Sequence, residues 1–135
     1  MPPTKKDVRP ADVIPRDGTP DGPAIGYMAH PVGGAVENNL ARARRWLKYL
    51  NSVGENAIYI APWIVECEIY DDNDPAQRES SLRRVCEVIK RCDFIALVGG
   101  RVSAGMAREA AVAVLAGVEV IDLTGLGEEP PTEAT

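Results

Sequence analysis

Several residue types that would point to other classes of protein are scarce in this chain. Its 135 residues include one histidine, one phenylalanine and three cysteines, and aromatic residues make up 5% of the total. The cysteines, at positions 67, 86 and 92, lack the spacing of a metal site or a redox pair, and one histidine adds little to such a donor set. We therefore expect no metal site, no cofactor and thiols that stay reduced.

Long hydrophobic runs and an excess of positive charge are also missing. No segment approaches the roughly 20 apolar residues of a membrane-spanning helix, and the first residues lack the apolar core of a signal peptide. The net charge of -5 argues against polymeric nucleic acid, whose phosphates are bound by clustered Lys and Arg. These features predict a cytoplasmic protein that binds neither membranes nor polymeric nucleic acid. The net charge does not argue against a small anionic ligand, which needs only a local positive site.

Proline is concentrated at one end of the chain. Residues 1–23 hold six of the eleven prolines, which remove backbone donors and leave no apolar periodicity, so we expect a flexible arm there. Residues 126–135 read as a solvated acidic tail. The composition of the remainder, 24–125, fits one globular domain.

Short apolar runs alternate with helical patterns within this domain, as in βαβ units with a parallel sheet. The long segment from Pro62 to Pro75 is expected to be a loop. The sequence predicts a flavodoxin- or Rossmann-like α/β three-layer sandwich with a central parallel sheet of four to five strands. The expected strands are 24–29, 57–61, 94–98 and 118–122, and the expected helices are 36–50, 80–91 and 104–116.

Ligands of open parallel sheets bind beyond the carboxyl ends of the strands. After the first strand come His30 and then Gly33 and Gly34, a Gly-rich turn before a helix, where backbone N–H groups can approach an anion. The same glycines serve a tight connection equally well. Asn38 and Asn39, in the first turn of the next helix, lie near the expected site, and either is a candidate ligand contact, although Asn is also common early in helices.

The stretch after the third strand carries the most information. Ser103 is placed to cap the following helix, and Glu109 then falls in its second turn, at the end that faces the strand tips. The helix dipole favours an ionised carboxylate there, as a glycosidic nucleophile requires. Taken alone, a surface glutamate paired with Arg108 is the more common explanation.

The order in which several residues occur along the chain favours a functional role for Glu109 over a surface ion pair. Tyr27 at the first strand, Asp93 opening the third, and then Ser103, Gly105 and Glu109 resemble the nucleoside 2-deoxyribosyltransferase superfamily, which includes nucleoside 5'-monophosphate N-glycosidases. The likeness spans residues 25–124. The resemblance implies that Glu109 attacks the anomeric carbon, that Tyr27 orients Glu109, and that Asp93 has a structural or helix-capping role.

The resemblance also implies a substrate and an assembly. A serine at position 103, where the transferases carry an acidic residue, favours a 5'-phosphorylated nucleoside, with Gly33, Gly34 and Arg101 as phosphate contacts. A covalent glycosyl-glutamate would then be released to water or to a second base. Neighbouring subunits commonly close the pocket in this superfamily, which implies a homodimer or larger assembly. The other expected substrate contacts are His30, Asn38, Gly100, Gly105 and Met106.

The segment after the second strand offers a proton donor. Asp72 could protonate the departing base while Trp63 packs against it. The alternative for this acidic run is a solvated turn in which Asp74 caps the next helix before Pro75.

One departure from the superfamily keeps other functions open. Many relatives carry an Asp in the helix before the third strand, whereas residues 82–86 here read Leu-Arg-Arg-Val-Cys. A nucleotide-binding or sensing module without chemistry is therefore the second hypothesis. A phosphoribohydrolase of the cytokinin-activating type ranks lower, because Gly99 and Gly100 lie too far from Glu109, and an interaction-only module remains.

Overall fold

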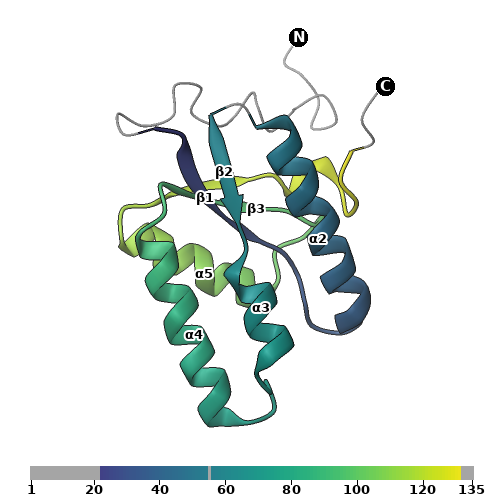
Figure 1. Ribbon diagram of the computed structural model, residues 1–135, viewed down its shortest axis with the longest axis vertical. Coiled ribbons are helices and arrows are strands. Elements are labelled where there is room, and N and C mark those ends of the chain that lie inside the picture. The colour runs from purple at the N-terminus through teal and green to yellow at the C-terminus, as the bar shows by residue number, and fades with distance from the viewer. Residues whose placement is uncertain (1–21, 55, 132–135) are drawn as a thin grey trace.

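The sheet that organises the molecule is fully parallel. The computed structural model describes residues 22–54 and 56–131, in which helices flank a sheet of four strands (Figure 1). The strands lie in the order β2-β1-β3-β4, so the two most buried strands are central. The predicted parallel α/β architecture is confirmed. The strands are β1 (Ala24–Ala29), β2 (Ala57–Ile60), β3 (Phe94–Leu97) and β4 (Glu119–Asp122).

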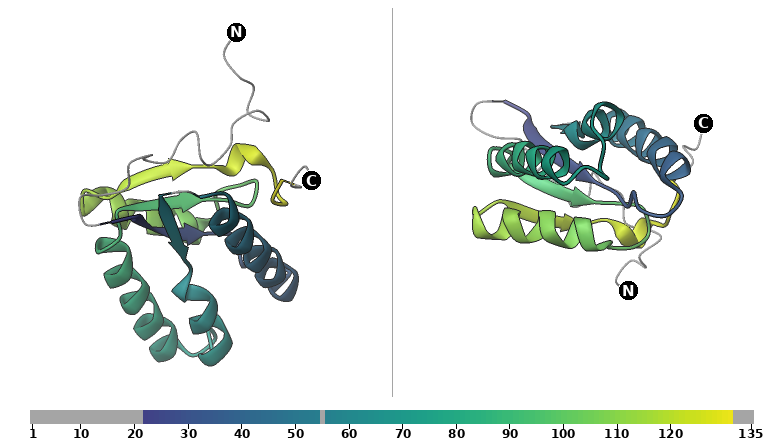
Figure 2. Two further views of the ribbon diagram at one scale, coloured as in Figure 1. Left: turned by 45° about the horizontal axis from the view of Figure 1, so that its top comes forward. Right: turned by 90° about the horizontal axis from the view of Figure 1, so that it is seen from below.

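Helices cover both faces of this sheet. The chain leaves β1 towards one edge and leaves β3 towards the other, so right-handed crossovers place their helices on opposite faces. In Figures 1 and 2, α2 lies on one side, whereas α4 and α5 lie together on the other, where they pack against each other. The result is the expected three-layer arrangement. The helical elements are α2 (Val36–Val53), α3 (Pro62–Ile69), α4 (Pro75–Lys90), α5 (Ala104–Leu115) and the short η2 (Thr124–Leu126).

The segment expected to be a loop is largely helical, and this prediction was wrong. It contains α3, and α4 begins at Pro75 rather than near residue 80. Both helices start with proline, which needs no backbone donor at the first helical position and has its φ already set. Asp74 caps α4, because its side chain accepts a hydrogen bond from the Ala76 N–H. Only a short turn therefore separates the two helices.

Two residues tie the amino end of β3 to β1. The Asp93 N–H donates to the Ile25 carbonyl at 2.8 Å, and its Oδ2 accepts from the Ile25 N–H at 2.7 Å. Asp93 therefore has a structural role, in which it forms hydrogen bonds to β1, and it is not a helix cap. One residue further, the Phe94 ring lies so close to Gly26 that a Cβ there would overlap it. Glycine at position 26 lets these central strands pack.

The acidic end of the described chain is attached to α2. Glu129 accepts hydrogen bonds from Arg42 and Arg45, and the Trp46 indole N–H donates to the Glu128 carbonyl at 2.8 Å. The expectation of a solvated tail therefore does not describe residues 128 and 129. The expected amino-terminal arm, apart from its last two residues, lies outside the described residues.

Candidate active site

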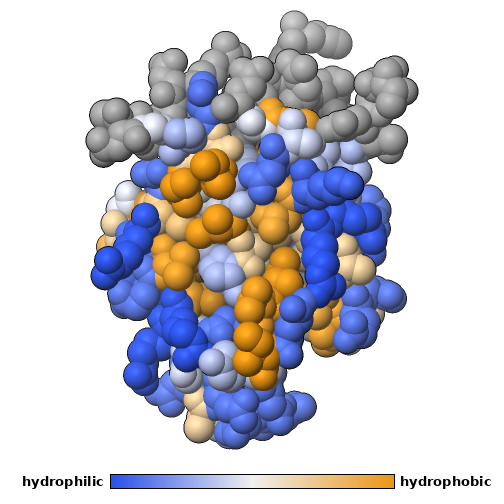
Figure 3. All heavy atoms as spheres, in the orientation of Figure 1, coloured by the Kyte–Doolittle hydropathy of each residue, from blue (hydrophilic) through white to orange (hydrophobic). Residues whose placement is uncertain are grey.

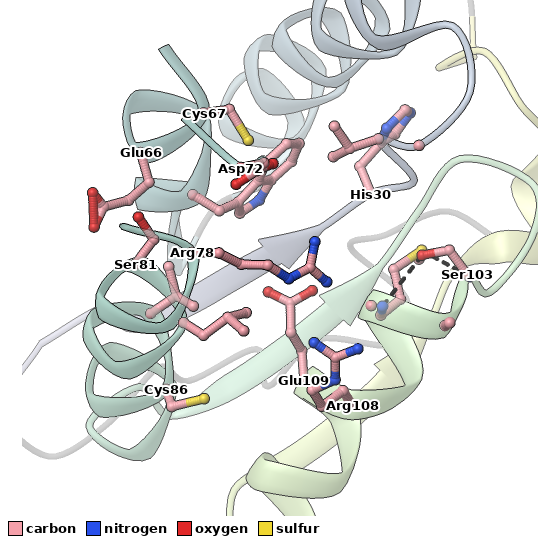
Figure 4. Close-up of a pocket in the computed structure, with 18 of the residues that line it drawn as sticks. His30, Glu66, Cys67, Asp72, Arg78, Ser81, Cys86, Ser103, Arg108 and Glu109 are labelled. Atoms are coloured by element: carbon pink, nitrogen blue, oxygen red, sulfur yellow. Dashed lines mark hydrogen bonds between the residues drawn. The ribbon is translucent and has the colours of Figure 1, made fainter. Parts of the chain in front are cut away.

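A cavity of about 430 Å³ lies at the carboxyl edge of the sheet. Segments that follow β1, β2 and β3 line it together with α4, as Figure 4 shows. The connections from β1 and β3 diverge at this point, which is where open parallel sheets bind ligands. The volume is within the usual range of small-molecule sites.

Tyr27 and Glu109 meet at this cavity. The Tyr27 hydroxyl donates to Glu109 Oε2 at 2.5 Å, joining the middle of β1 to the second turn of α5. Tyr27 is fully buried, and Glu109 is partly buried and lines the cavity. Tyr27 thus donates to one carboxylate oxygen of Glu109 and makes no hydrogen bond to the other.

Burial dominates the electrostatics of this pair. It raises the pKa of Glu109 to about 7, while the Tyr27 hydrogen bond and the Arg108 charge oppose the rise. Burial, reinforced by the negative charge of Glu109, also raises the pKa of Tyr27 far above its ordinary value. Tyr27 therefore remains a hydrogen-bond donor while Glu109 changes its charge near neutral pH.

The start of α5 is fixed as the sequence predicts. Ser103 is its N-cap, and its Oγ accepts a hydrogen bond from the Met106 N–H at 3.2 Å. Ser103, Gly105 and Met106 all line the cavity. Gly99 allows the approach to this helix, because its φ is +103° and a Cβ there would lie 2.9 Å from His30 Nε2.

The turn after β1 is held by Asn39, one of the two asparagines that the sequence places near the site. Asn39 is buried, and its Nδ2 donates to the carbonyls of Val32 and Gly33. Gly33 lines the cavity, whereas Gly34 and the exposed Asn38 are not part of its lining. Helical spacing was the available signal, because positions 39, 43, 46 and 50 form the buried face of α2.

His30 lines the cavity in a neutral form. Its Nδ1 lies 2.6 Å from the Pro31 carbonyl oxygen, which can only accept, so Nδ1 carries the proton. Burial lowers the pKa of His30. Its Nε2 is buried and has no hydrogen-bond partner in the structure.

Trp63 and Asp72 both reach the cavity, as the sequence predicts. The Trp63 indole N–H donates to the Met28 carbonyl at 2.7 Å, which fixes the ring at the cavity wall. Nearby acids are engaged in local structure, since Asp71 accepts from the Asn73 N–H and Asp74 caps α4. Asp72 is the acid from this run that faces the cavity in Figure 4.

The arginines that line the cavity differ from the one that the sequence predicts, Arg101. Arg78 from α4 and Arg108 from α5 line it, whereas Arg101 does not. Gly100 is also absent from the lining, because it packs against Glu128, where a Cβ would lie 2.8 Å from Cγ. Arg78 was missed because the expected helix began near residue 80, and Arg108 was considered only as a partner of Glu109.

Two thiols complete the polar wall. Cys67 and Cys86 line the cavity, although Cys86 was expected to fill the core. Burial raises the pKa of both thiols, so they are weak nucleophiles. Within residues 22–54 and 56–131, no three His, Cys, Asp or Glu side chains converge as a metal ion would require. In the same residues no helix is long and apolar enough to cross a membrane.

Residues 24–122 match the family described as Domain of unknown function (DUF7768). The chain belongs to this family. The match spans every strand of the DUF7768 chain and each segment that lines its cavity. A comparison with curated protein sequences finds no match.

A solved structure with the same fold is that of a 2-deoxyribosyltransferase from the psychrotolerant bacterium Bacillus psychrosaccharolyticus, described as a biocatalyst for nucleoside synthesis. The likeness covers 73% of the DUF7768 chain and 71% of that chain, with a TM-score of 0.54. Sequence identity is 18%. At that identity the likeness shows the shared fold.

Proposed function

We propose that this protein cleaves or exchanges the N-glycosidic bond of a nucleoside or nucleoside 5'-monophosphate. The observation that carries the proposal is the Tyr27–Glu109 hydrogen bond at the wall of a ligand-sized cavity. The fold shared with a 2-deoxyribosyltransferase supports a glycosyl-transfer reaction. Glu109 is the proposed nucleophile and Tyr27 the group that orients it.

The proposed first step forms a glycosyl ester. The carboxylate oxygen of Glu109 that Tyr27 does not hold attacks C1' of the sugar, and the bond between C1' and the base nitrogen breaks. The electron pair of that bond leaves with the base, which takes up a proton. Asp72 is the proposed source of this proton, because it lines the cavity with Glu109 (Figure 4), whereas Glu66, which also lines it, is paired with Arg84.

The second step regenerates the carboxylate. Water attacks C1' and loses a proton to solvent or to Asp72, while the bond between C1' and the Glu109 oxygen breaks and its electron pair returns to the carboxylate. Alternatively, a second base attacks C1' in place of water. The Tyr27 hydrogen bond stabilises the negative charge that returns to Glu109. Only the ionised form of Glu109 is a nucleophile, so its raised pKa makes the reaction depend on pH near neutrality.

The remaining lining residues would bind the substrate. The fixed Trp63 ring offers an apolar wall for the base. Ser103, Gly105 and Met106 at the start of α5, with Gly33 opposite, are the proposed contacts to the sugar phosphate. His30 supports this end of the cavity.

Base release from a panel of substrates tests the proposal. The pure protein is incubated with ribo- and deoxyribonucleosides and their 5'-monophosphates, and free base is followed by chromatography beside Glu109→Gln. We expect release that falls at least about a thousand-fold in the variant, as when other catalytic nucleophiles are removed. Undiminished release by a folded Glu109→Gln protein would remove Glu109 from the mechanism.

One observation favours a second function, a nucleotide-binding module without chemistry. The cavity-lining residues of α4 are Arg78, Ser81, Leu82, Val85 and Cys86, so this helix supplies no carboxyl group. Saturable nucleotide binding without base release on long incubation would establish this function. Any steady turnover that depends on Glu109 would exclude it.

We also propose that the protein is a homodimer or larger homo-oligomer. Figure 3 shows apolar side chains gathered over β2 and α3 on one face. Ile58, Val65 and Ile69 contribute to it, with exposed fractions of 46%, 53% and 64%. A second copy would bury these side chains, and light scattering after size-exclusion chromatography gives the mass directly.

A further inference from the structure

Two guanidinium groups in the cavity form no ion pair with a carboxylate of the described residues. Arg78 reaches in from α4 and Arg108 from α5, and neither forms an ion pair with any residue that the structure describes. Other arginines of α4 are paired, Arg83 with Glu79 and Arg84 with Glu66. Among the arginines of α4, the one without an ion pair is thus the one that lines the cavity.

Their placement around Glu109 is visible in Figure 4. In this view both guanidinium groups extend towards Glu109, and no ion pair joins either of them to its carboxylate. Their N–H donors are therefore free to bind a ligand. An arginine presents five such donors in a planar fork that matches phosphate oxygens.

The charge balance of the cavity points the same way. Glu109 and Asp72 both line it, and without the arginines their negative charges would repel an anionic ligand. Glu66 also lines the cavity but is paired with Arg84. Arg78 and Arg108 thus supply the positive charge that a phosphate monoester needs.

We propose that Arg78, with Arg108 beside it, binds the phosphate of a nucleoside 5'-monophosphate and so selects nucleotides over nucleosides. This inference rests on the proposed function and narrows its substrate class. In place of Arg101, which does not line the cavity, it adds a residue of α4 to the phosphate contacts proposed above at the start of α5 and at Gly33. Arg78 carries the larger share, because it reaches towards the middle of the cavity in Figure 4.

Binding, rather than turnover, is the measurement that tests this selection. Calorimetry compares each nucleoside with its own 5'-monophosphate, using full-length Glu109→Gln as the common background. In that background a role for Arg78 as a counter-charge to Glu109 is already removed. A loss of phosphate preference on adding Arg78→Gln then reports on the ligand itself. Arg83→Gln, an exposed arginine of the same helix outside the cavity, is the matched control.

We expect the monophosphate to bind at least about 10-fold more tightly than the nucleoside, as a charge-assisted hydrogen-bond pair provides. Arg78→Gln should abolish this preference by weakening the monophosphate alone. Arg78→Lys should keep part of it, Arg108→Gln should lower it less, and Arg83→Gln should leave it unchanged. The preference should also shrink as salt concentration rises.

Three results would overturn the inference. They are an unchanged preference in Arg78→Gln, an equal loss for both ligands, or no binding of any monophosphate in the panel. A failure of the proposed function looks different, because the wild-type protein would then bind monophosphates through Arg78 and release no base.

Discussion

The Tyr27 hydroxyl and the Glu109 carboxylate, 82 residues apart in the chain, share a hydrogen bond of 2.5 Å. Tyr27 is buried in β1, so its ring position is set by the core of the sheet. Glu109 is carried by α5, whose start is fixed by the Ser103 cap. A buried strand and a capped helix thus position one carboxylate at the cavity wall.

Replacing Tyr27 with phenylalanine should move the pH dependence of base release. The tyrosine hydrogen bond lowers the pKa of Glu109, which burial has raised to about 7. In wild type, kcat/KM should rise with pH and level off above this pKa, because the ionised carboxylate attacks. In Tyr27→Phe the midpoint should lie at higher pH, with the deficit smaller in alkaline solution. An unshifted midpoint would show that the hydroxyl does not act through Glu109.

Glu109 should also make stability depend on pH. Its folded-state pKa is raised from 4.5 to about 7, so the folded protein holds the proton more tightly than the unfolded chain. The resulting stabilisation is complete below pH 4.5 and is lost as pH rises through 7. The unfolding free energy of Glu109→Gln relative to that of wild type should therefore be higher at pH 8 than at pH 5, by on the order of 1 to 3 kcal/mol.

Urea unfolding at the two pH values measures this difference. Glu79→Gln, an exposed carboxylate of α4, is the control and should show a smaller dependence. Equal stability increments for Glu109→Gln at pH 5 and pH 8 would contradict the raised pKa.

The matched pair Asn39→Ala and Asn38→Ala should separate a structural residue from a surface one. Asn39 is buried and bonds the Val32 and Gly33 carbonyls, so its loss should cost about 1 to 2 kcal/mol of unfolding free energy and weaken ligand binding. Asn38 is exposed and should be close to neutral. Denaturation and ligand titration of both variants decide the matter, and a larger effect at Asn38 would reverse the assignment.

Asp93 should matter for stability and not for substrate binding. Asp93→Ala removes the acceptor for the Ile25 N–H and should cost about 1 kcal/mol, whereas Asp93→Asn keeps an acceptor and should lose less. KM should be unchanged in both, because Asp93 is outside the cavity lining. A raised KM in a stable variant would give Asp93 a part in the site.

The sheet was predictable because each strand is a short apolar run between helical patterns. The helices between β2 and β3 were harder to predict. The eight residues of α3 are too few to show a clear periodicity, and prolines 62 and 75 suggest a loop although both begin helices. Local signals do not distinguish these two uses of proline.

The candidate site divides in the same way. Glu109, Tyr27 and Ser103 follow from motif order and a helix cap, and the structure places all three together. Arg78 and Arg108 did not follow, because their direction depends on the rotation of packed helices. Gly100 was an expected substrate contact, yet it packs against Glu128 instead.

The central claim, that Glu109 forms a covalent bond to the sugar, has a direct test. A 2'-fluorinated nucleoside or its 5'-monophosphate slows breakdown of such an ester, because the fluorine disfavours positive charge at C1'. We expect base release in one equivalent, an intact mass raised by that of the sugar moiety, and peptide mapping of the added mass to Glu109. Release of base with no adduct on Glu109, or with the adduct on another residue, would contradict the mechanism.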